Sequence, residues 1–269
     1  MREAEVQQVS DALLSGESLL LVGEPGSGKT MLGEAVRSRL EKAGYTVGMV
    51  KYSGSAIDLL KELCEQLGVD TMTDGEKPKQ KAATRLRADL KDELSKQGTC
   101  LIADNADRWS ASLRYWLEDC WRAGTLMLLL GWNCPQKDIF SKLPVRRLEA
   151  FKDDAIRDIL RQEASNQGLK LSVSELSRLH SSTGNNPAIA RRVVREAALG
   201  IGSEASAEHY QYIDGTPMLL AMLAVLGLVR LVGLGLGDKS LYVIGGALTL
   251  MVLMLRTLLY AANRGTRRL

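Results

Sequence analysis

The chain has 269 residues, of which 45% are hydrophobic and 25% charged, and this balance excludes a disordered or collagen-like polymer. The formal net charge is +3, but residues 217–269 hold six Lys or Arg and one acid, a net of +5, and residues 1–216 have a net of −2. A slightly acidic major part lacks the general excess of cations that neutralises phosphates. We therefore do not expect nucleic acid as a partner, although a smaller basic patch is left open.

Cysteine usage and the opening residues indicate a reducing, cytosolic setting for the first part of the chain. The four cysteines have no CxxC spacing and the chain has two histidines, so no zinc site or disulfide framework is predicted. The opening MREAEVQQVSDALLSGE is charged and typical of a helix, with no apolar core of a signal peptide. We expect this part to stay in the cytosol.

The first strong motif follows a short apolar strand at residues 18–22. The segment GEPGSGKT comes next, and an amphipathic helix follows over residues 31–44. Strand, glycine-rich loop and helix are the context of a P-loop, in which backbone N–H groups and the helix dipole hold phosphates. Lys29 is expected to reach the β and γ phosphates of ATP, and the Thr30 hydroxyl to coordinate Mg²⁺. The predicted binding residues are Gly23, Glu24, Pro25, Gly26, Ser27, Gly28, Lys29 and Thr30.

A second motif, the buried strand of residues 99–103, ends at Asp104. A carboxylate at this place is typical of the Walker B position, so Asp104 is predicted to share the Mg²⁺ site with Thr30. The next residue is Asn105, which can hydrogen-bond water but cannot accept its proton. Asp107 is the alternative for that role. Nucleotide binding is therefore the firmer prediction, and a slow ATPase activity is the further one.

Strands and helices alternate up to about residue 150, and only helices follow. Further strands are predicted at 45–50, 125–131 and near 145–151, with helices at 56–67, 81–96 and 110–122. This order predicts an α/β fold with a parallel sheet covered by helices on both faces. Three helices, over 153–168, 172–184 and 187–200, predict a small helical lid. The expected domains are an ATPase core (1–150), the lid (151–200), a linker (201–216) and a membrane segment (217–269).

The membrane segment consists of two apolar runs, residues 217–236 and 241–261. At about 1.5 Å per residue, each run is long enough to span the roughly 30 Å hydrocarbon core of a bilayer. Arg230 and Arg256 count against this reading, but each lies past the midpoint of its run and can extend toward the headgroups. A buried helical hairpin of a soluble domain is the alternative. The basic residues after the second run place both termini and the ATPase domain on the cytosolic side of the inner (cytoplasmic) membrane.

Taken together, GEPGSGKT, LIADNAD and the lid segment STGNNPAIARR resemble the AAA+ ATPases. The branch is the one with origin-recognition, transposition and secretion ATPases, with STAND ATPases as near neighbours. The resemblance covers residues 1 to about 200. It implies sensor 1 at Asn133, sensor 2 at Arg191 or Arg192, and an arginine finger at Arg146 or Arg147. Asn133 as a plain turn residue, and these arginines as solvated helix or edge-strand cations, are left open.

Three functions fit these features. The first is a membrane-anchored ATP-binding protein that forms homo-oligomers on the cytosolic face and organises an envelope or secretion complex with an unknown protein partner. The second is a signalling or defence ATPase whose oligomers gather the hairpins and perturb the lipid bilayer. The third is a DNA-linked ATPase of the transposition type. Secretion ATPases of this branch usually carry a periplasmic domain after one helix, and this chain does not match that pattern.

Overall fold

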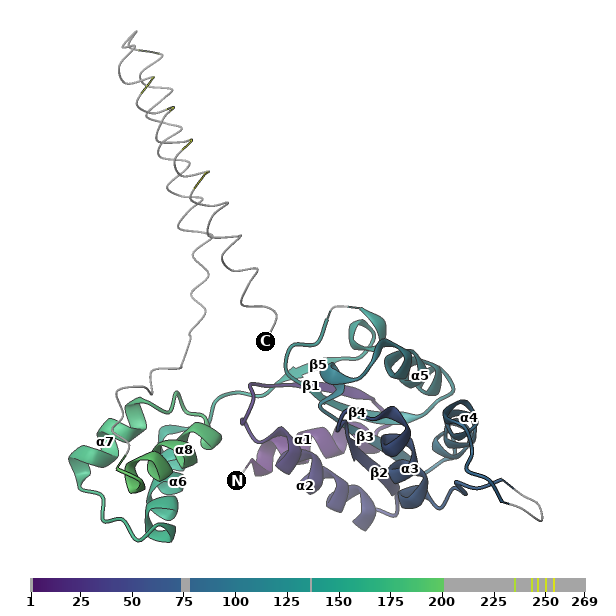
Figure 1. The fold of residues 1–269 in the computed structure, drawn as a ribbon, viewed down its shortest axis with the longest axis horizontal. Coiled ribbons are helices and arrows are strands. Elements are labelled where there is room, and N and C mark those ends of the chain that lie inside the picture. The colour runs from purple at the N-terminus through teal and green to yellow at the C-terminus, as the bar shows by residue number, and fades with distance from the viewer. Residues whose placement is uncertain are drawn as a thin grey trace. The chain divides into compact units, whose positions relative to one another are not determined.

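A parallel sheet of five strands forms the centre of the protein. The computed structural model describes residues 2–73, 78–135 and 137–200, together with the single positions 235, 243, 246, 250 and 254. The sheet has the order β2-β3-β4-β1-β5, and every neighbouring pair is parallel. Its strands are β1 (Leu19–Val22), β2 (Thr46–Lys51), β3 (Thr99–Asp104), β4 (Leu126–Gly131) and β5 (Val145–Arg147). The predicted α/β fold with a parallel sheet is confirmed (Figure 1).

Helices cover both faces of the sheet, because alternate strand residues point to opposite sides. Leu19 and Leu21 of β1 pack with α1 (Glu3–Leu14) and α2 (Lys29–Lys42). Leu20 packs on the other face, where α3, α4 and α5 build the larger core. These helices span Ala56–Leu67, Ala83–Leu94 and Ala111–Arg122, and the short helices η1 (Ala106–Arg108) and η2 (Asp138–Ser141) lie in the loops after β3 and β4. Strands buried on both faces explain the near-continuous apolar runs in the sequence.

Three of the four tryptophans pack in the larger core formed by α3, α4 and α5. Trp109 and Trp116 are buried, and Trp121 packs against the same cluster. Trp132 differs, since it is 54% exposed. The side chains of Trp109 and Trp116 are therefore explained by packing rather than by a surface that stacks bases.

The three helices of the predicted lid form a separate small core. They are α6 (Asp153–Asn166), α7 (Val173–Ser181) and α8 (Pro187–Ala198). Their apolar faces meet at Ile156, Leu160, Leu179, Val193 and Val194. Ser172 caps α7 in a capping box with Glu175, and Asn186 caps α8 ahead of a proline in its first turn.

The predicted linker and membrane hairpin fall outside the described residues, apart from five single helical positions. The chain divides into two compact units, Met1–His209 and Tyr210–Leu269. Within the part of the chain that is described, no helix is both long enough and apolar enough to cross a bilayer. The hairpin of residues 217–269 stays a prediction.

Candidate functional site

The loop between β1 and α2 has the backbone of a phosphate cradle. Gly26 and Gly28 have φ values of +79° and +89°, in the left-handed region that side chains with a Cβ rarely adopt. Gly28 is the N-cap of α2, and the helix begins at Lys29. The helix therefore begins two residues before the predicted range of 31–44 and ends at Lys42. An anion beside this loop would meet the unpaired N–H groups and the positive end of the α2 dipole.

Lys29 is buried beneath this loop and holds it together. Lys29 is 8% exposed. Its Nζ donates hydrogen bonds to the backbone oxygens of Gly23 at 2.7 Å and Glu24 at 2.9 Å. Burial lowers the pKa of the ammonium below its ordinary value of 10.5. Asp107 and then Asp104 oppose that shift, because both favour the charged form. Nζ is hydrogen-bonded to backbone oxygens rather than to a carboxylate, so the ammonium can turn toward phosphate oxygens without breaking an ion pair.

Thr30 and Asp104 meet although 74 positions separate them in the chain. Thr30 Oγ1 donates to Asp104 Oδ2 at 2.8 Å, and the backbone N–H of Asn105 donates to Oδ1 at 2.9 Å. Asp104 is fully buried, and Trp109 Nε1 donates to its backbone oxygen at 3.1 Å. The two predicted magnesium ligands are thus adjacent. A hydroxyl and a carboxylate are hard oxygen donors, and Mg²⁺ commonly takes only one or two protein carboxylates plus phosphates and water, so these residues fit that ion.

The residues after Asp104 turn back toward the loop. Asn105 has a φ of +51°, in the left-handed region that Asn tolerates better than most residues, and it directly precedes η1. This turn places Asp107 against the end of β4, where its Oδ1 accepts the Trp132 N–H at 3.3 Å. Asp107 is also the acid that most strongly favours the charged form of Lys29. Asp107 therefore lies nearer to the centre of the site than its sequence position suggests.

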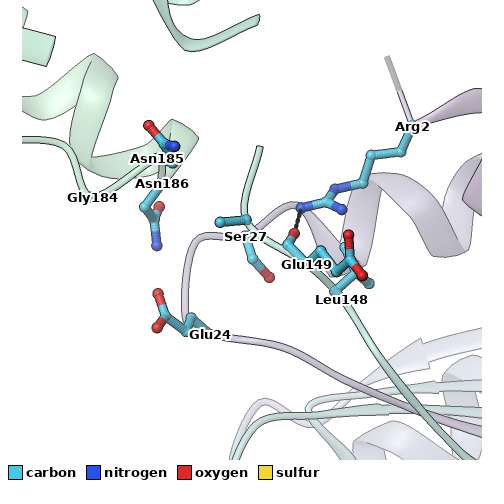
Figure 2. A pocket seen from close by; sticks show the side chains of 9 residues that line it. Arg2, Glu24, Ser27, Leu148, Glu149, Gly184, Asn185 and Asn186 are labelled. Atoms are coloured by element: carbon cyan, nitrogen blue, oxygen red, sulfur yellow. Dashed lines mark hydrogen bonds between the residues drawn. The ribbon is translucent and has the colours of Figure 1, made fainter. Parts of the chain in front are cut away.

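A cavity of about 110 Å³ lies beside the P-loop. Figure 2 shows Glu24 and Ser27 of the loop, Arg2 and Glu149 on one side, and Asn186 of the lid on the other. The remaining lining residues are Leu148, Ala150, Gly184 and Asn185. The cavity therefore adjoins the phosphate cradle and is lined by residues of the P-loop, the lid and the segment between core and lid.

Arg2 was missed by the sequence analysis. Its Nη2 donates to the Glu149 backbone oxygen at 2.6 Å, its Nη1 pairs with Glu5 at 3.0 Å, and its guanidinium lies 4.1 Å from the centre of the Phe151 ring. It therefore ties the start of α1 to the segment that joins core and lid. One arginine near the chain start carries no local pattern, so only the fold reveals this contact.

The remaining predicted site residues do not line the cavity beside the P-loop. Asn133 is exposed and lines a second cavity of about 620 Å³ with Trp132 and Arg147. Arg146 pairs with Gln8 of α1, so within β5 it is Arg147 that faces the second cavity. Arg191 lies on the exposed side of α8, as does Arg192, which forms an ion pair with Glu196 at 3.5 Å. Neither arginine lines the cavity beside the P-loop. Their sensor and finger roles, and that of Asn133, stay predictions.

This geometry is that of a P-loop domain with an α/β core and a helical lid. Residues 14–132 match the sequence model of a family described as AAA domain. This match covers less than half of the chain, and the parallel sheet with its P-loop agrees with it. A search of curated proteins finds no similar sequence.

Solved structures with a similar fold share few identical residues with this chain. A DNA replication initiation factor is 16% identical with a TM-score of 0.50, over 83% of this chain and 68% of that one. The replication initiator DnaA bound to AMPPCP and single-stranded DNA is 16% identical, with a TM-score of 0.49 over 83% and 69%. The Thermotoga maritima RuvB Holliday junction branch migration motor is 17% identical, with a TM-score of 0.44 over 73% and 61%. At this identity the likeness concerns the fold alone.

Proposed function

We propose that this chain binds MgATP at the P-loop and hydrolyses it slowly, and that it does so as a membrane-anchored oligomer. The observation that carries the nucleotide part is the meeting of Thr30 and Asp104 at 2.8 Å beside the buried Lys29. Three groups from two separate motifs converge where the phosphates and the ion of MgATP would lie. When bound, Mg²⁺ would neutralise charge on the phosphates.

Each group of the chain has a role in this proposal. The P-loop amides and Lys29 bind the phosphates, while Thr30 and Asp104 hold the metal. Asp107 is the acid placed to orient water and take its proton, because the amide of Asn105 cannot accept one. Asp107 also accepts the Trp132 N–H, so part of its hydrogen-bonding capacity is already used. Slow turnover is the expected consequence.

The membrane part rests on the sequence. The runs 217–236 and 241–261 have the length and apolarity of membrane spans, and the basic tail favours cytosolic termini. In this arrangement the ATPase domain assembles on the cytosolic face, and the nucleotide state controls that assembly. Organisation of an envelope or secretion complex is the function we propose for it.

The experiment that tests this proposal uses the full chain purified in detergent. Particles are imaged with ATP, with ADP and without nucleotide, and with Lys29→Ala as the control. ATP-dependent rings in the wild type alone support the proposal. Monomers in every condition would contradict the oligomeric part. Vesicle leakage that depends on ATP and is lost in Arg230→Leu would favour the signalling or defence alternative, since a passive anchor gives no leakage.

A DNA-linked ATPase is the second candidate. One protein with a similar fold, at a TM-score of 0.50, is a DNA replication initiation factor, and this does not fit our expectation that nucleic acid is no partner. The test is the anisotropy of labelled single- and double-stranded DNA mixed with the full chain in detergent, at rising salt. Binding at low salt that weakens steadily as salt rises would support this candidate. Absence of binding at low salt would remove it.

A further inference from the structure

The turn before α8 contacts both the P-loop and the start of the lid at Phe151 and Asp153. Gly184 and Asn185 have φ values of +52° and +59°, and Asn186 follows as the N-cap, 5% exposed. The Phe151 N–H donates to the Asn185 backbone oxygen at 3.2 Å, and Asn185 Nδ2 donates to Asp153 Oδ1 at 2.8 Å. Two hydrogen bonds therefore fasten the turn to the start of α6.

Asn186 uses both ends of its amide group. Its Oδ1 accepts the Ala188 N–H at 3.0 Å and the Ile189 N–H at 3.5 Å, which caps α8. Its Nδ2 donates to the Pro25 backbone oxygen at 2.9 Å, across 161 positions of the chain. Oδ1 therefore bonds only to the lid, whereas Nδ2 bonds to the P-loop.

The fit around this hydrogen bond is tight. A Cβ added to Gly26 would lie 2.5 Å from Ala188 Cβ and 2.9 Å from Asn186 Oδ1. The P-loop therefore cannot shift toward α8 without displacing the helix start, since close-packed atoms transmit such displacements. Pro25 also directly follows Glu24, whose backbone oxygen accepts from Lys29. A phosphate that draws the Lys29 ammonium away from the Glu24 backbone oxygen would change the loop at the residue next to Pro25, which accepts from Asn186.

We propose that Asn186 is a positioning residue that couples the P-loop to the lid through its hydrogen bond to Pro25. This rests on the proposed function, in which the P-loop binds ATP. Nucleotide bound at the P-loop then changes the rate of amide hydrogen exchange in the first turn of α8. Conversely, a change in the position of the lid changes the exchange rate of the P-loop amides. The side chain does not touch the phosphates in this scheme.

The test separates the donor of Asn186 from its cap. Asn186→Ser keeps a good N-cap but is too short to replace the donor at Pro25, and Asn186→Asp keeps the cap and replaces the donor with an acceptor. Asn186→Ala removes both. Amide hydrogen exchange is measured on the full chain in detergent for residues 23–28 and 188–192, without nucleotide and with ATP. Thermal melting of each variant shows whether the lid core is intact.

Loss of one hydrogen bond is expected to speed exchange in the P-loop about five-fold in nucleotide-free Asn186→Ser, with α8 unchanged. Asn186→Ala should speed exchange in both segments. ATP should slow exchange at both segments of the wild type, but at the P-loop alone in Asn186→Ser and Asn186→Asp.

Equal P-loop exchange in the wild type and both cap-retaining variants would overturn the proposal. So would ATP protection of α8 that persists in them. A wild type that ATP does not protect anywhere would instead contradict the proposed function, and the nucleotide-free comparison would still decide whether Asn186 holds the loop.

Discussion

Replacing Asp104 separates its contribution to folding from its contribution to the metal site. In Asp104→Asn, the amide oxygen can still accept the Asn105 N–H, and the NH₂ group can donate to Thr30 Oγ1, so both contacts seen at 2.9 and 2.8 Å keep a partner. In Asp104→Ala, the Thr30 hydroxyl and the Asn105 N–H, both of half-buried residues, lose their partner at this fully buried position, so the cost falls toward the lower end of the range for buried groups. Each buried polar group left unpaired costs about 1–3 kcal/mol. For a domain of this size, about 1 kcal/mol lowers Tm by roughly 2–4 °C.

We therefore expect Asp104→Ala to melt several degrees below the wild type and Asp104→Asn to melt close to it. Both should lose magnesium-dependent release of phosphate, because a neutral side chain is a poor ligand for Mg²⁺. Both should still bind ATP in the presence of a chelator, through the P-loop. Thermal melting, phosphate release and ATP titration are measured together, with the exposed Asp92→Asn as the control. Turnover of Asp104→Asn equal to the wild type would refute the assignment of Asp104 to the metal.

Three further outcomes follow from burial and packing. Gly48→Ala should lower the free energy of unfolding by about 1–3 kcal/mol, because the new Cβ would clash with Leu63 and lie 3.4 Å from Leu67. A melting temperature equal to that of the wild type would show that α3 shifts without cost. ATP affinity should be greatest at neutral pH and should weaken as pH rises through the lowered pKa of Lys29, below its ordinary 10.5, since phosphate favours the ammonium; affinity that stays constant up to pH 10.5 would contradict this. Burial raises the pKa of Cys134 to about 12, so the folded protein should react slowly with iodoacetamide at neutral pH, and rapid labelling would speak against that burial.

Most of the fold could be predicted because its patterns are local. The apolar run before the P-loop and the run ending at Asp104 are strands buried on both faces, and such strands show as continuous aliphatic stretches. Helix boundaries were accurate where caps are explicit. The helix at 56–67 begins after Ser55, which accepts from the Asp58 N–H, and ends at Gly68 in a left-handed conformation.

The site was predictable where one short motif supplies several groups. The P-loop and Asp104 each follow a strand, and parallel strands bring their carboxyl ends to the same edge, so the meeting of Thr30 and Asp104 could be anticipated. Contacts between distant single residues could not. Arg2 with Glu149 depends on how the chain start meets the segment after β5, and Asn186 with Pro25 depends on how the lid packs on the core. An Asn before a Pro is typical of a helix N-cap, which fits Asn186, but a capping pattern says nothing about the second partner of its amide.

Arg146 illustrates another limit. Two adjacent arginines in a strand point to opposite faces, and a short strand at the sheet edge gives no pattern that tells which face meets which cavity. In the structure, Arg146 hydrogen-bonds Gln8, and Arg147 lines the second cavity. Sequence alone leaves that choice open.

The central claim is that the loop of residues 23–30 binds ATP with Lys29 as its cation. The most direct measurement is an equilibrium ATP titration of the full chain in detergent, compared with Lys29→Ala and with Lys42→Ala, which removes an exposed lysine at the far end of the same helix. Saturable binding in the wild type and in Lys42→Ala, and its loss in Lys29→Ala, is the predicted result. Equal affinity in all three proteins, or no binding by any of them, would contradict the account.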